Sequence, residues 1–193
     1  GAIPSPRTPT VDVTPHTIVA TAPPLLPMPA TSFVGRTQEI GAITALLADG
    51  NTRLVTVVAP GGMGKTQLSL AVTAALQPAF PDGVHFVPLA PLSAPEHIPA
   101  AILQSLQLPM GGNSPRAQLL GYLQEKQLLL VLDNFEHLLL PSPDAVAGGE
   151  NLVVELLQAA PQVKLLVTCR ERLNVQGEAV FVLGGFPSPT GKR

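Results

Sequence analysis

A glycine-rich turn followed by lysine and threonine is the stretch of this sequence best equipped for chemistry. Gly61, Gly62 and Gly64 permit backbone angles that other residues resist, so consecutive amide groups can point inward at an anion. Lys65 can reach the outer phosphates of such an anion, and the Thr66 hydroxyl is a ligand for magnesium. This order of residues is typical of a P-loop, the turn that cradles the phosphates of a nucleotide.

The segments on either side of the turn have the composition that a P-loop requires. Residues 53–58 are rich in β-branched side chains, as in a strand buried on both faces. Leu68, Val72 and Leu76 recur at helical spacing, so a helix should begin at the turn and aim its positive dipole end there. The P-loop pattern starts with glycine, whereas this chain has Ala59, which is tolerable if its φ angle is negative. The alternative is a glycine-rich turn with a chance Gly-Lys-Thr sequence.

A second stretch with chemical potential follows a run of aliphatic residues. Residues 128–132 predict a central strand of a parallel sheet, and Asp133 follows at its carboxyl end, where open α/β sheets bind ligands. This is the Walker B pattern, in which the carboxylate holds magnesium through water and completes the metal site begun by Thr66. The alternative role for Asp133 is to cap the next turn.

The position after this aspartate bears on catalysis. Many P-loop ATPases carry a second acidic residue there, which orients the attacking water. Here the residue is Asn134, which cannot accept a proton, so we expect slow hydrolysis of ATP or none. Glu136 is the nearest carboxylate able to act as a base. Two roles stay open for it, catalytic base and surface residue.

An arginine follows the strand predicted over residues 163–168. A guanidinium group binds phosphoryl oxygens in a fork, so we favour Arg170 as a sensor of the γ-phosphate over a plain surface charge. Cys169 is expected to be a small packed residue and not a nucleophile, because no histidine or carboxylate partner is specified.

The remaining periodic segments predict a complete α/β domain around these motifs. Thr37 is expected to cap a first helix, and Ser93 with Glu96 resembles a capping box for a later one. Ser114 and Pro115 should start another helix, and these last two helices are expected to be crossovers on the sheet. A fourth helix is expected around residues 152–157, and strands over 84–89, 163–168 and 179–183, the first of them at the sheet margin because it contains Pro88.

Length and composition limit the possible classes of protein. The 193 residues suffice for one α/β domain, and the net charge of −2 provides no basic field, so we expect no direct binding of nucleic acid. No apolar run approaches the ~20 residues that span a bilayer, and no signal peptide is recognisable. A single cysteine excludes an internal disulfide and suits a reducing cytoplasm. The first residue, glycine, suggests a fragment of a longer chain.

Composition also predicts three regions. Residues 1–30 are rich in proline, with eight prolines in the first 29 residues, which indicates an extended linker. A proline-rich ligand for an SH3-like partner and an arm packed on the domain are the alternatives. Residues 31–187 form the predicted nucleotide-binding domain, and residues 188–193 form a C-terminal tail.

Four separated motifs resemble, in the same order, the nucleotide-binding domain of STAND ATPases. The resemblance is strongest to the AP-ATPase/NB-ARC branch, which has an AAA+-like core and occurs in large bacterial transcriptional regulators and signalling proteins. It extends over about Thr31 to Pro187, and its motifs are Phe33–Arg36, Pro60–Thr66, Leu129–His137 and Leu165–Leu173. Two departures are Ala59 in place of glycine and Cys169 where serine is common.

The resemblance implies a P-loop NTPase fold, a three-layer α/β/α sandwich whose five-stranded parallel sheet has the P-loop strand at its centre. It also implies that Val34, Gly35 and Arg36 lie against the adenine and ribose of the nucleotide. The cofactor-binding residues are then these three together with Gly61, Gly62, Met63, Gly64, Lys65, Thr66 and Gln67. Closing helical and winged-helix modules, sensing repeats and an effector would lie outside this chain.

The leading functional interpretation is an ATP/ADP-binding regulatory switch that requires Mg²⁺. The candidate catalytic residues are Lys65, Asp133, Glu136 and Arg170, and the candidate metal ligands are Thr66 and Asp133. Expected partners are the nucleotide, other domains of the same protein and, depending on the nucleotide, a second copy. The alternatives are an ordinary P-loop ATPase or kinase, although no arginine-rich lid or acceptor site is recognisable, and a degenerate scaffold for protein contacts.

Overall fold

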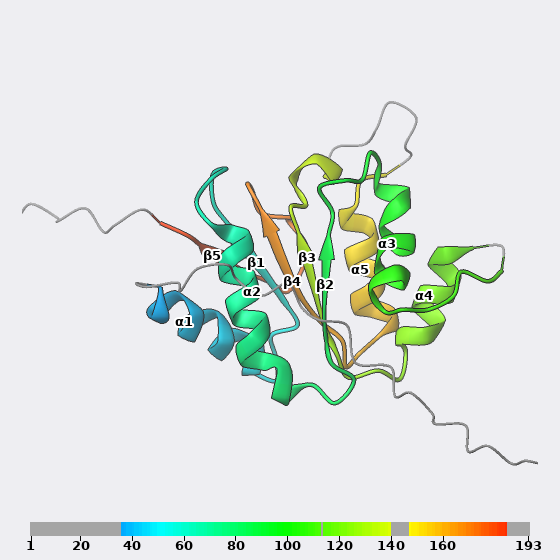
Figure 1. Ribbon diagram of the computed structural model, residues 1–193, viewed down its shortest axis with the longest axis horizontal. Helices are drawn as coiled ribbons and strands as arrows, with labels where there is room; N and C mark the ends of the chain where they lie inside the picture. Colours follow the sequence, from blue (N-terminus) through cyan, green and yellow to red (C-terminus); the bar gives the residue numbers. More distant parts are fainter. Residues whose placement is uncertain (1–35, 113, 140–146, 185–193) are drawn as a thin grey trace, which may run out of the picture.

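A sheet of five parallel strands organises the part of the chain that this computed structural model describes, residues 36–112, 114–139 and 147–184. The strand order is β2-β3-β4-β1-β5 (Figure 1). The strands are β1 (Leu54–Val58), β2 (Val84–Pro88), β3 (Leu129–Asp133), β4 (Lys164–Cys169) and β5 (Glu178–Val182). The regions predicted over residues 1–30 and 188–193 lie outside the described residues.

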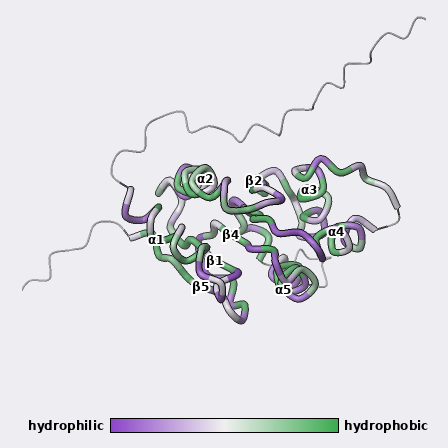
Figure 2. The backbone as a smooth tube through the Cα atoms, turned by 90° about the horizontal axis from the view of Figure 1, so that it is seen from below, coloured by the Kyte–Doolittle hydropathy of each residue, from purple (hydrophilic) through white to green (hydrophobic). Residues whose placement is uncertain are grey.

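Helices cover both faces of the sheet, which confirms the three-layer α/β/α fold. Helices α1 and α2 pack on one face, and α3, α4 and α5 pack on the other (Figure 2). No helix in the described part of the chain is long and apolar enough to cross a membrane. The helices are α1 (Thr37–Ala48), α2 (Lys65–Leu76), α3 (Ile98–Ser105), α4 (Pro115–Leu123) and α5 (Glu150–Ala159), with short 3₁₀ turns at Gln77–Ala79, Pro95–His97 and Glu136–Leu138.

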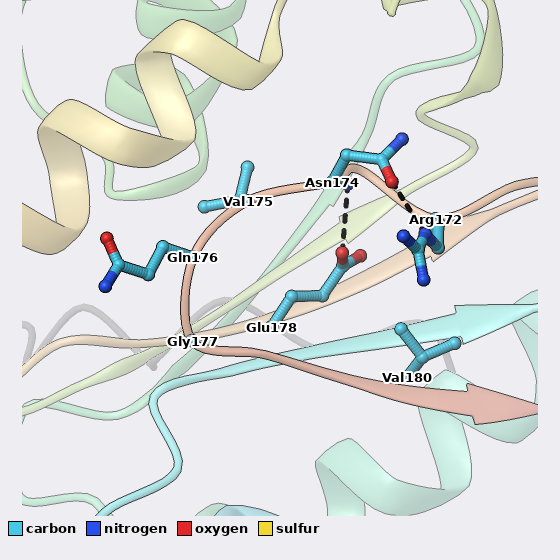
Figure 3. A pocket seen from close by; sticks show the side chains of 7 residues that line it. All are labelled: Arg172, Asn174, Val175, Gln176, Gly177, Glu178 and Val180. Atoms are coloured by element: carbon cyan, nitrogen blue, oxygen red, sulfur yellow. Dashed lines mark hydrogen bonds between the residues drawn. The ribbon is translucent and has the colours of Figure 1, made fainter.

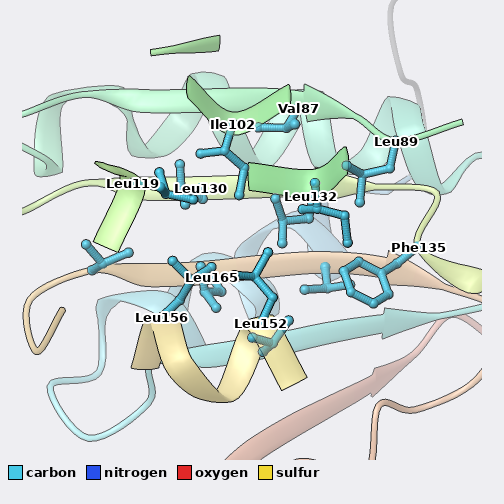
Figure 4. Packing of buried hydrophobic residues seen from close by; sticks show 14 of the residues in the cluster. Val87, Leu89, Ile102, Leu119, Leu130, Leu132, Phe135, Leu152, Leu156 and Leu165 are labelled. Carbon is cyan, nitrogen blue, oxygen red and sulfur yellow. The ribbon is translucent and has the colours of Figure 1, made fainter. Parts of the chain in front are cut away.

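Two hydrophobic clusters fill the spaces between the layers, because successive side chains of a strand point to opposite faces. In β3, Leu130 and Leu132 join the cluster under α3, α4 and α5 (Figure 4), whereas Leu129 and Val131 join the cluster under α1 and α2. All five residues of β3 are buried. This explains why its sequence is continuously aliphatic instead of alternating.

The order of the strands departs from one expectation. The middle place belongs to β4, and the P-loop strand β1 lies one place away, between β4 and β5. The Walker B strand β3 is likewise interior, between β2 and β4, while β2 forms the margin as predicted. The carboxyl ends of β1, β3 and β4 are therefore adjacent, which brings their loops together.

The predicted helix starts are partly confirmed. Ser114 caps α4, its hydroxyl accepting a hydrogen bond from the Ala117 amide at 3.2 Å. Thr37 is the first helical residue of α1 and not its cap, and the cap position belongs to Arg36. The capping box at Ser93 is wrong, because a 3₁₀ turn begins at Pro95 and no side chain caps it. Helix α3 packs on β2 as a crossover helix, whereas α4 packs mainly against α3 and α5.

Two basic side chains fasten helix ends to the amino edge of the sheet. Arg53, just before β1, donates hydrogen bonds to the carbonyl oxygens of Leu157 (2.7 Å) and Ala160 (2.5 Å) at the end of α5, and to that of Val163 (3.2 Å) just before β4. Lys164 in β4 donates to the carbonyl oxygen of Leu47 at 2.6 Å, at the end of α1. Burial lowers the pKa of the Lys164 ammonium. Cations at helix C-termini also complement the helix dipole.

We expect Arg53→Met to lower the free energy of unfolding by roughly 1–3 kcal/mol, because it leaves the carbonyl oxygens at the end of α5 without their donor. Methionine keeps most of the aliphatic stem, so the loss reports the hydrogen bonds. Urea unfolding followed by circular dichroism measures it. The matched control is Arg172→Met, which removes an exposed guanidinium whose one hydrogen-bond partner within the described part of the chain is the Asn174 side chain. Equal denaturation midpoints for the two variants would contradict this role of Arg53.

Candidate functional site

The glycine-rich turn after β1 has the backbone of a phosphate cradle. Gly62 and Gly64 adopt φ angles of 78° and 77°, the left-handed region that favours glycine, and α2 begins at the next residue. Gly61 is not in that region. A Cβ atom there would lie 3.2 Å from Nη2 of Arg170, a close contact with the end of a flexible side chain. Two of the three glycines therefore provide backbone freedom, and the third lies beside Arg170.

Ala59 meets the condition under which alanine can replace the first glycine of the pattern, a negative φ angle. It is not among the described non-glycine residues with positive φ. Its amide donates to the carbonyl oxygen of Cys169 at 3.2 Å, which extends the pairing of β1 with β4 by one residue. The missing first glycine of the pattern therefore leaves the turn intact.

Lys65 lies in the turn with its ammonium directed at the backbone. The residue is 7% exposed, and Nζ donates to the carbonyl oxygens of Ala59 (2.7 Å) and Pro60 (3.3 Å). Among the described residues, no carboxylate forms an ion pair with it. A buried cation with only neutral partners is incompletely compensated, so an anion entering the turn would stabilise it. This charge arrangement fits a phosphate group.

A chain of hydrogen bonds connects the P-loop helix to two strands. The Thr66 hydroxyl donates to Oδ2 of Asp133 at 2.8 Å, and the Thr168 hydroxyl donates to Oδ1 at 2.6 Å. Thr168 Oγ1 also accepts from the amide of Asn134 at 2.9 Å, and Asn134 has a φ of 69°. Asp133 is only 6% exposed, so these bonds offset much of the cost of burying its carboxylate. The structure thus brings the two predicted metal ligands into contact.

The pair formed by Thr66 and Asp133 suits magnesium bound together with a nucleotide. Within the described ranges, no group of three histidine, cysteine, aspartate or glutamate side chains could hold a metal alone. Magnesium is commonly held by one or two carboxylates, with phosphates and water completing its octahedron. One carboxylate and one hydroxyl at the mouth of a phosphate cradle match that requirement.

Arg170 and Glu136 meet beside the turn. Nε of Arg170 lies 3.3 Å from Oε1 of Glu136, and the two side chains are 64% and 15% exposed, respectively. The guanidinium is also the group that a Cβ atom added at Gly61 would meet. The structure therefore brings the predicted phosphate sensor and the predicted base together, and both roles stay predictions.

Residues expected on the base side of the nucleotide are described only in part. Val34 and Gly35 lie outside the described residues. Arg36 donates from Nη2 to the carbonyl oxygen of Met63 at 2.8 Å, which ties it to the P-loop. Gln67 faces partly inward from the first turn of α2, and its Oε1 atom is buried without a hydrogen-bond partner among the described residues.

An open hollow of about 400 Å³ lies at the loop between β4 and β5, and none of its lining residues belongs to the predicted site. Figure 3 shows the carboxylate of Glu178 turned back into this loop, where it accepts from the amide of Asn174. Its other oxygen accepts from the amide of Leu173. The polar capacity of Glu178 is thus used by the loop itself, so this hollow adds nothing to the phosphate site.

Sequence reasoning did not predict the role of Thr168. The sequence does contain a signal for this role, because Thr168 is a polar residue at the carboxyl end of a predicted strand, directly before Cys169. Its partner Asp133 is 35 residues away, and only the pairing of β3 with β4 places the two side by side. The contact of Arg36 with Met63 was missed as well, because these residues are 27 positions apart in the chain.

Comparison with known proteins agrees with this geometry. The sequence model of the family described as Novel STAND NTPase 1 matches residues 27–176. The chain belongs to this family of STAND NTPases. The STAND resemblance of the sequence is therefore confirmed, whereas the NB-ARC branch stays a prediction.

Two curated relatives of this STAND NTPase domain come from Mycobacterium tuberculosis. A putative HTH-type transcriptional regulator is 40% identical over 138 residues, covering 71% of this chain and 14% of the regulator. An uncharacterized protein is 36% identical over 152 residues, covering 78% of this chain and 36% of that protein. The chain thus matches about a third or less of the length of these relatives.

Two solved structures show the same fold as the STAND domain. The Aeropyrum pernix ORC1 protein in complex with DNA matches with a TM-score of 0.61 and 18% identity, over 79% of this chain and 46% of that chain. Drosophila ORC bound to DNA matches with a TM-score of 0.60 and 16% identity, over 92% and 51% of the two chains. At this level of identity the similarity concerns the fold alone.

We expect Thr168→Val to lower the free energy of unfolding by roughly 1–3 kcal/mol, because an oxygen of Asp133 loses its donor and the Asn134 amide its acceptor. Valine has nearly the shape of threonine, and Thr168→Ser, which keeps the hydroxyl, is the matched control. Urea unfolding of both variants measures the difference. The role assigned to Thr168 fails if valine and serine give the same midpoint.

Cys169 should react with thiol reagents only after the domain opens. Its side chain is fully buried, and burial raises the pKa of the thiol, with a further rise from the nearby charge of Glu136. Modification by an aromatic disulfide reagent at neutral pH should be slower than in guanidinium by roughly a hundredfold or more. Absorbance of the released thiolate measures the rate for this single cysteine. Rapid stoichiometric labelling of the folded domain would contradict its packing.

Proposed function

We propose that this STAND NTPase domain is the ATP/ADP-binding regulatory switch of a larger protein. The observation that supports the proposal best is the contact between Thr66 and Asp133. It joins a phosphate cradle to a buried carboxylate at the edge where parallel α/β sheets bind ligands. Such a pair can hold magnesium when a magnesium-bound nucleotide occupies the cradle.

Each residue of the turn has a distinct part in binding. The loop amides and the Lys65 ammonium hold the β- and γ-phosphates, and Lys65 exchanges its carbonyl partners for phosphate oxygens. Thr66 and Asp133 hold magnesium, which when bound neutralises phosphate charge. The STAND resemblance assigns contacts with the adenine and ribose to Val34, Gly35 and Arg36.

Hydrolysis by this domain is slow. Asn134 occupies the position of the usual second acidic residue, and its backbone amide is committed to Thr168. Glu136 is the remaining candidate for the base, but its carboxylate is paired with Arg170. A switch that keeps its nucleotide for a long time is favoured by this arrangement over an enzyme of rapid turnover.

The regulatory part of the proposal is supported by the relatives. One of them is a putative HTH-type transcriptional regulator far longer than this chain. We infer that the bound nucleotide sets how this domain contacts other domains of its own protein and a second copy, in the cytoplasm. We further infer, from the net charge of −2, that this part of the protein makes no direct contact with nucleic acid.

Calorimetric titration with ADP and ATP, with and without magnesium and with GTP as a control, tests the proposal. We expect adenine-specific binding that Lys65→Ala weakens by roughly tenfold or more, because a charge-assisted contact to phosphate is lost. Lys126→Ala is the matched control, since Lys126 pairs with Asp82, away from the turn.

Three results would contradict the switch. Nucleotide affinity that survives Lys65→Ala unchanged would favour a degenerate scaffold for protein contacts. Rapid multiple turnover, or transfer of phosphate to a small molecule, would favour an ordinary ATPase or kinase. Absence of binding by the unmodified domain would show that this part of the protein does not form the site.

A further inference from the structure

The ion pair between Arg170 and Glu136 stands directly beside the phosphate cradle. The Arg170 guanidinium lies between the Glu136 carboxylate, 3.3 Å from its Nε atom, and Gly61 of the P-loop. A phosphate held by the loop amides would therefore be a neighbour of this guanidinium. The same cation faces a carboxylate on one side and the predicted position of a phosphate on the other.

The two members of the pair differ in freedom. The Arg170 side chain is largely exposed and ends a flexible stem, whereas Glu136 is mostly buried in the 3₁₀ turn after β3. Oε2 of Glu136 is buried and has no hydrogen-bond partner among the described residues. Arg170 is thus the member that can move, and its movement leaves the carboxylate of Glu136 without its cation.

The two charged residues that follow Arg170 do not offer Glu136 a replacement. Glu171 and Arg172 are both exposed, and Arg172 already donates to the side chain of Asn174. A buried carboxylate left without its cation is costly. Movement of Arg170 toward a phosphate is therefore opposed by the charge of Glu136.

We propose that Glu136 is a specificity-determining residue that disfavours ATP relative to ADP, because it competes with the γ-phosphate for Arg170. The inference rests on the proposed nucleotide switch and concerns only its preference between the two nucleotides. ADP has no γ-phosphate, so its binding leaves the ion pair in place. ATP binding draws the guanidinium toward the γ-phosphate and weakens the ion pair, so the charge of Glu136 lowers the affinity for ATP and leaves that for ADP as it is.

The size of the effect follows from the exposure of Arg170. Because one partner of the ion pair is largely exposed, solvent screens the pair, so removing the charge of Glu136 should tighten ATP binding by roughly fivefold and leave ADP binding unchanged. Glu136→Gln is the variant of choice, since it keeps the shape of the side chain and removes its charge. Glu171→Gln, at an exposed neighbouring carboxylate, is the matched control.

The experiment measures dissociation constants of Mg²⁺-ADP and of the β,γ-imido analogue of Mg²⁺-ATP, which prevents turnover from confusing the result. The quantity of interest is the ratio of the two constants in each variant. We expect the ratio to move toward the ATP analogue in Glu136→Gln only, and toward ADP in Arg170→Ala. The double variant Glu136→Gln/Arg170→Ala should match Arg170→Ala alone, because Glu136 acts only through Arg170.

The outcomes separate this inference from the function it rests on. Binding that depends on Lys65, with a ratio unchanged by Glu136→Gln in a domain of unchanged thermal stability, would overturn the role of Glu136 and leave the switch standing. A double variant that still prefers the ATP analogue more than Arg170→Ala would also overturn it. Absence of Lys65-dependent binding would overturn both. If Glu136→Gln unfolds, Glu136→Asp, whose shorter carboxylate weakens the pair, should shift the ratio in the same direction.

Discussion

The buried carboxylate of Asp133 is the interaction on which the rest of the site depends. A carboxylate removed from water is stable only when its oxygens accept hydrogen bonds, and Thr66 and Thr168 each donate one. This requirement fixes the start of α2 and the carboxyl ends of β3 and β4 relative to one another. The left-handed φ of Asn134 belongs to the same arrangement, since its amide turns back to the Thr168 hydroxyl. The phosphate cradle therefore stands on a scaffold that is connected across three elements.

Basic side chains serve different purposes at the two edges of the sheet. At the amino edge, Arg53 and Lys164 bind carbonyl oxygens at the ends of α5 and α1, where their charges stabilise helix termini. At the carboxyl edge, Lys65 and Arg170 lie beside the turn, together with the amino end of α2. Positive charge thus stabilises helix ends at the amino edge, whereas at the carboxyl edge it is available to bind an anion. A chain with few charged residues achieves this because parallel strands send all their following loops to one edge.

The site of this STAND NTPase domain combines the backbone of a phosphate-binding turn with an asparagine after Asp133, where a second acidic residue is common. The cradle needs only local backbone geometry, a lysine and a hydroxyl. Rapid hydrolysis needs in addition a free carboxylate that can orient water, and here Asn134 takes the usual place while Glu136 is engaged by Arg170. The chain matches only a part of its longer relatives, 36% of one and 14% of the other.

The sequence by itself determined the local elements and the order of the motifs. A β-branched strand, a glycine turn and an apolar helical stripe are properties of neighbouring residues, so the P-loop and the Walker B strand could be predicted from them. The three-layer fold followed from the resemblance of four motifs to the STAND ATPases. The sequence did not place β4 in the middle of the sheet, nor pair Thr168 with Asp133, Arg170 with Glu136, or Arg53 with the end of α5. These contacts join residues that are far apart in the chain. Only the tertiary structure decided them, because strand order and register are set by packing of the whole core and not by any one segment.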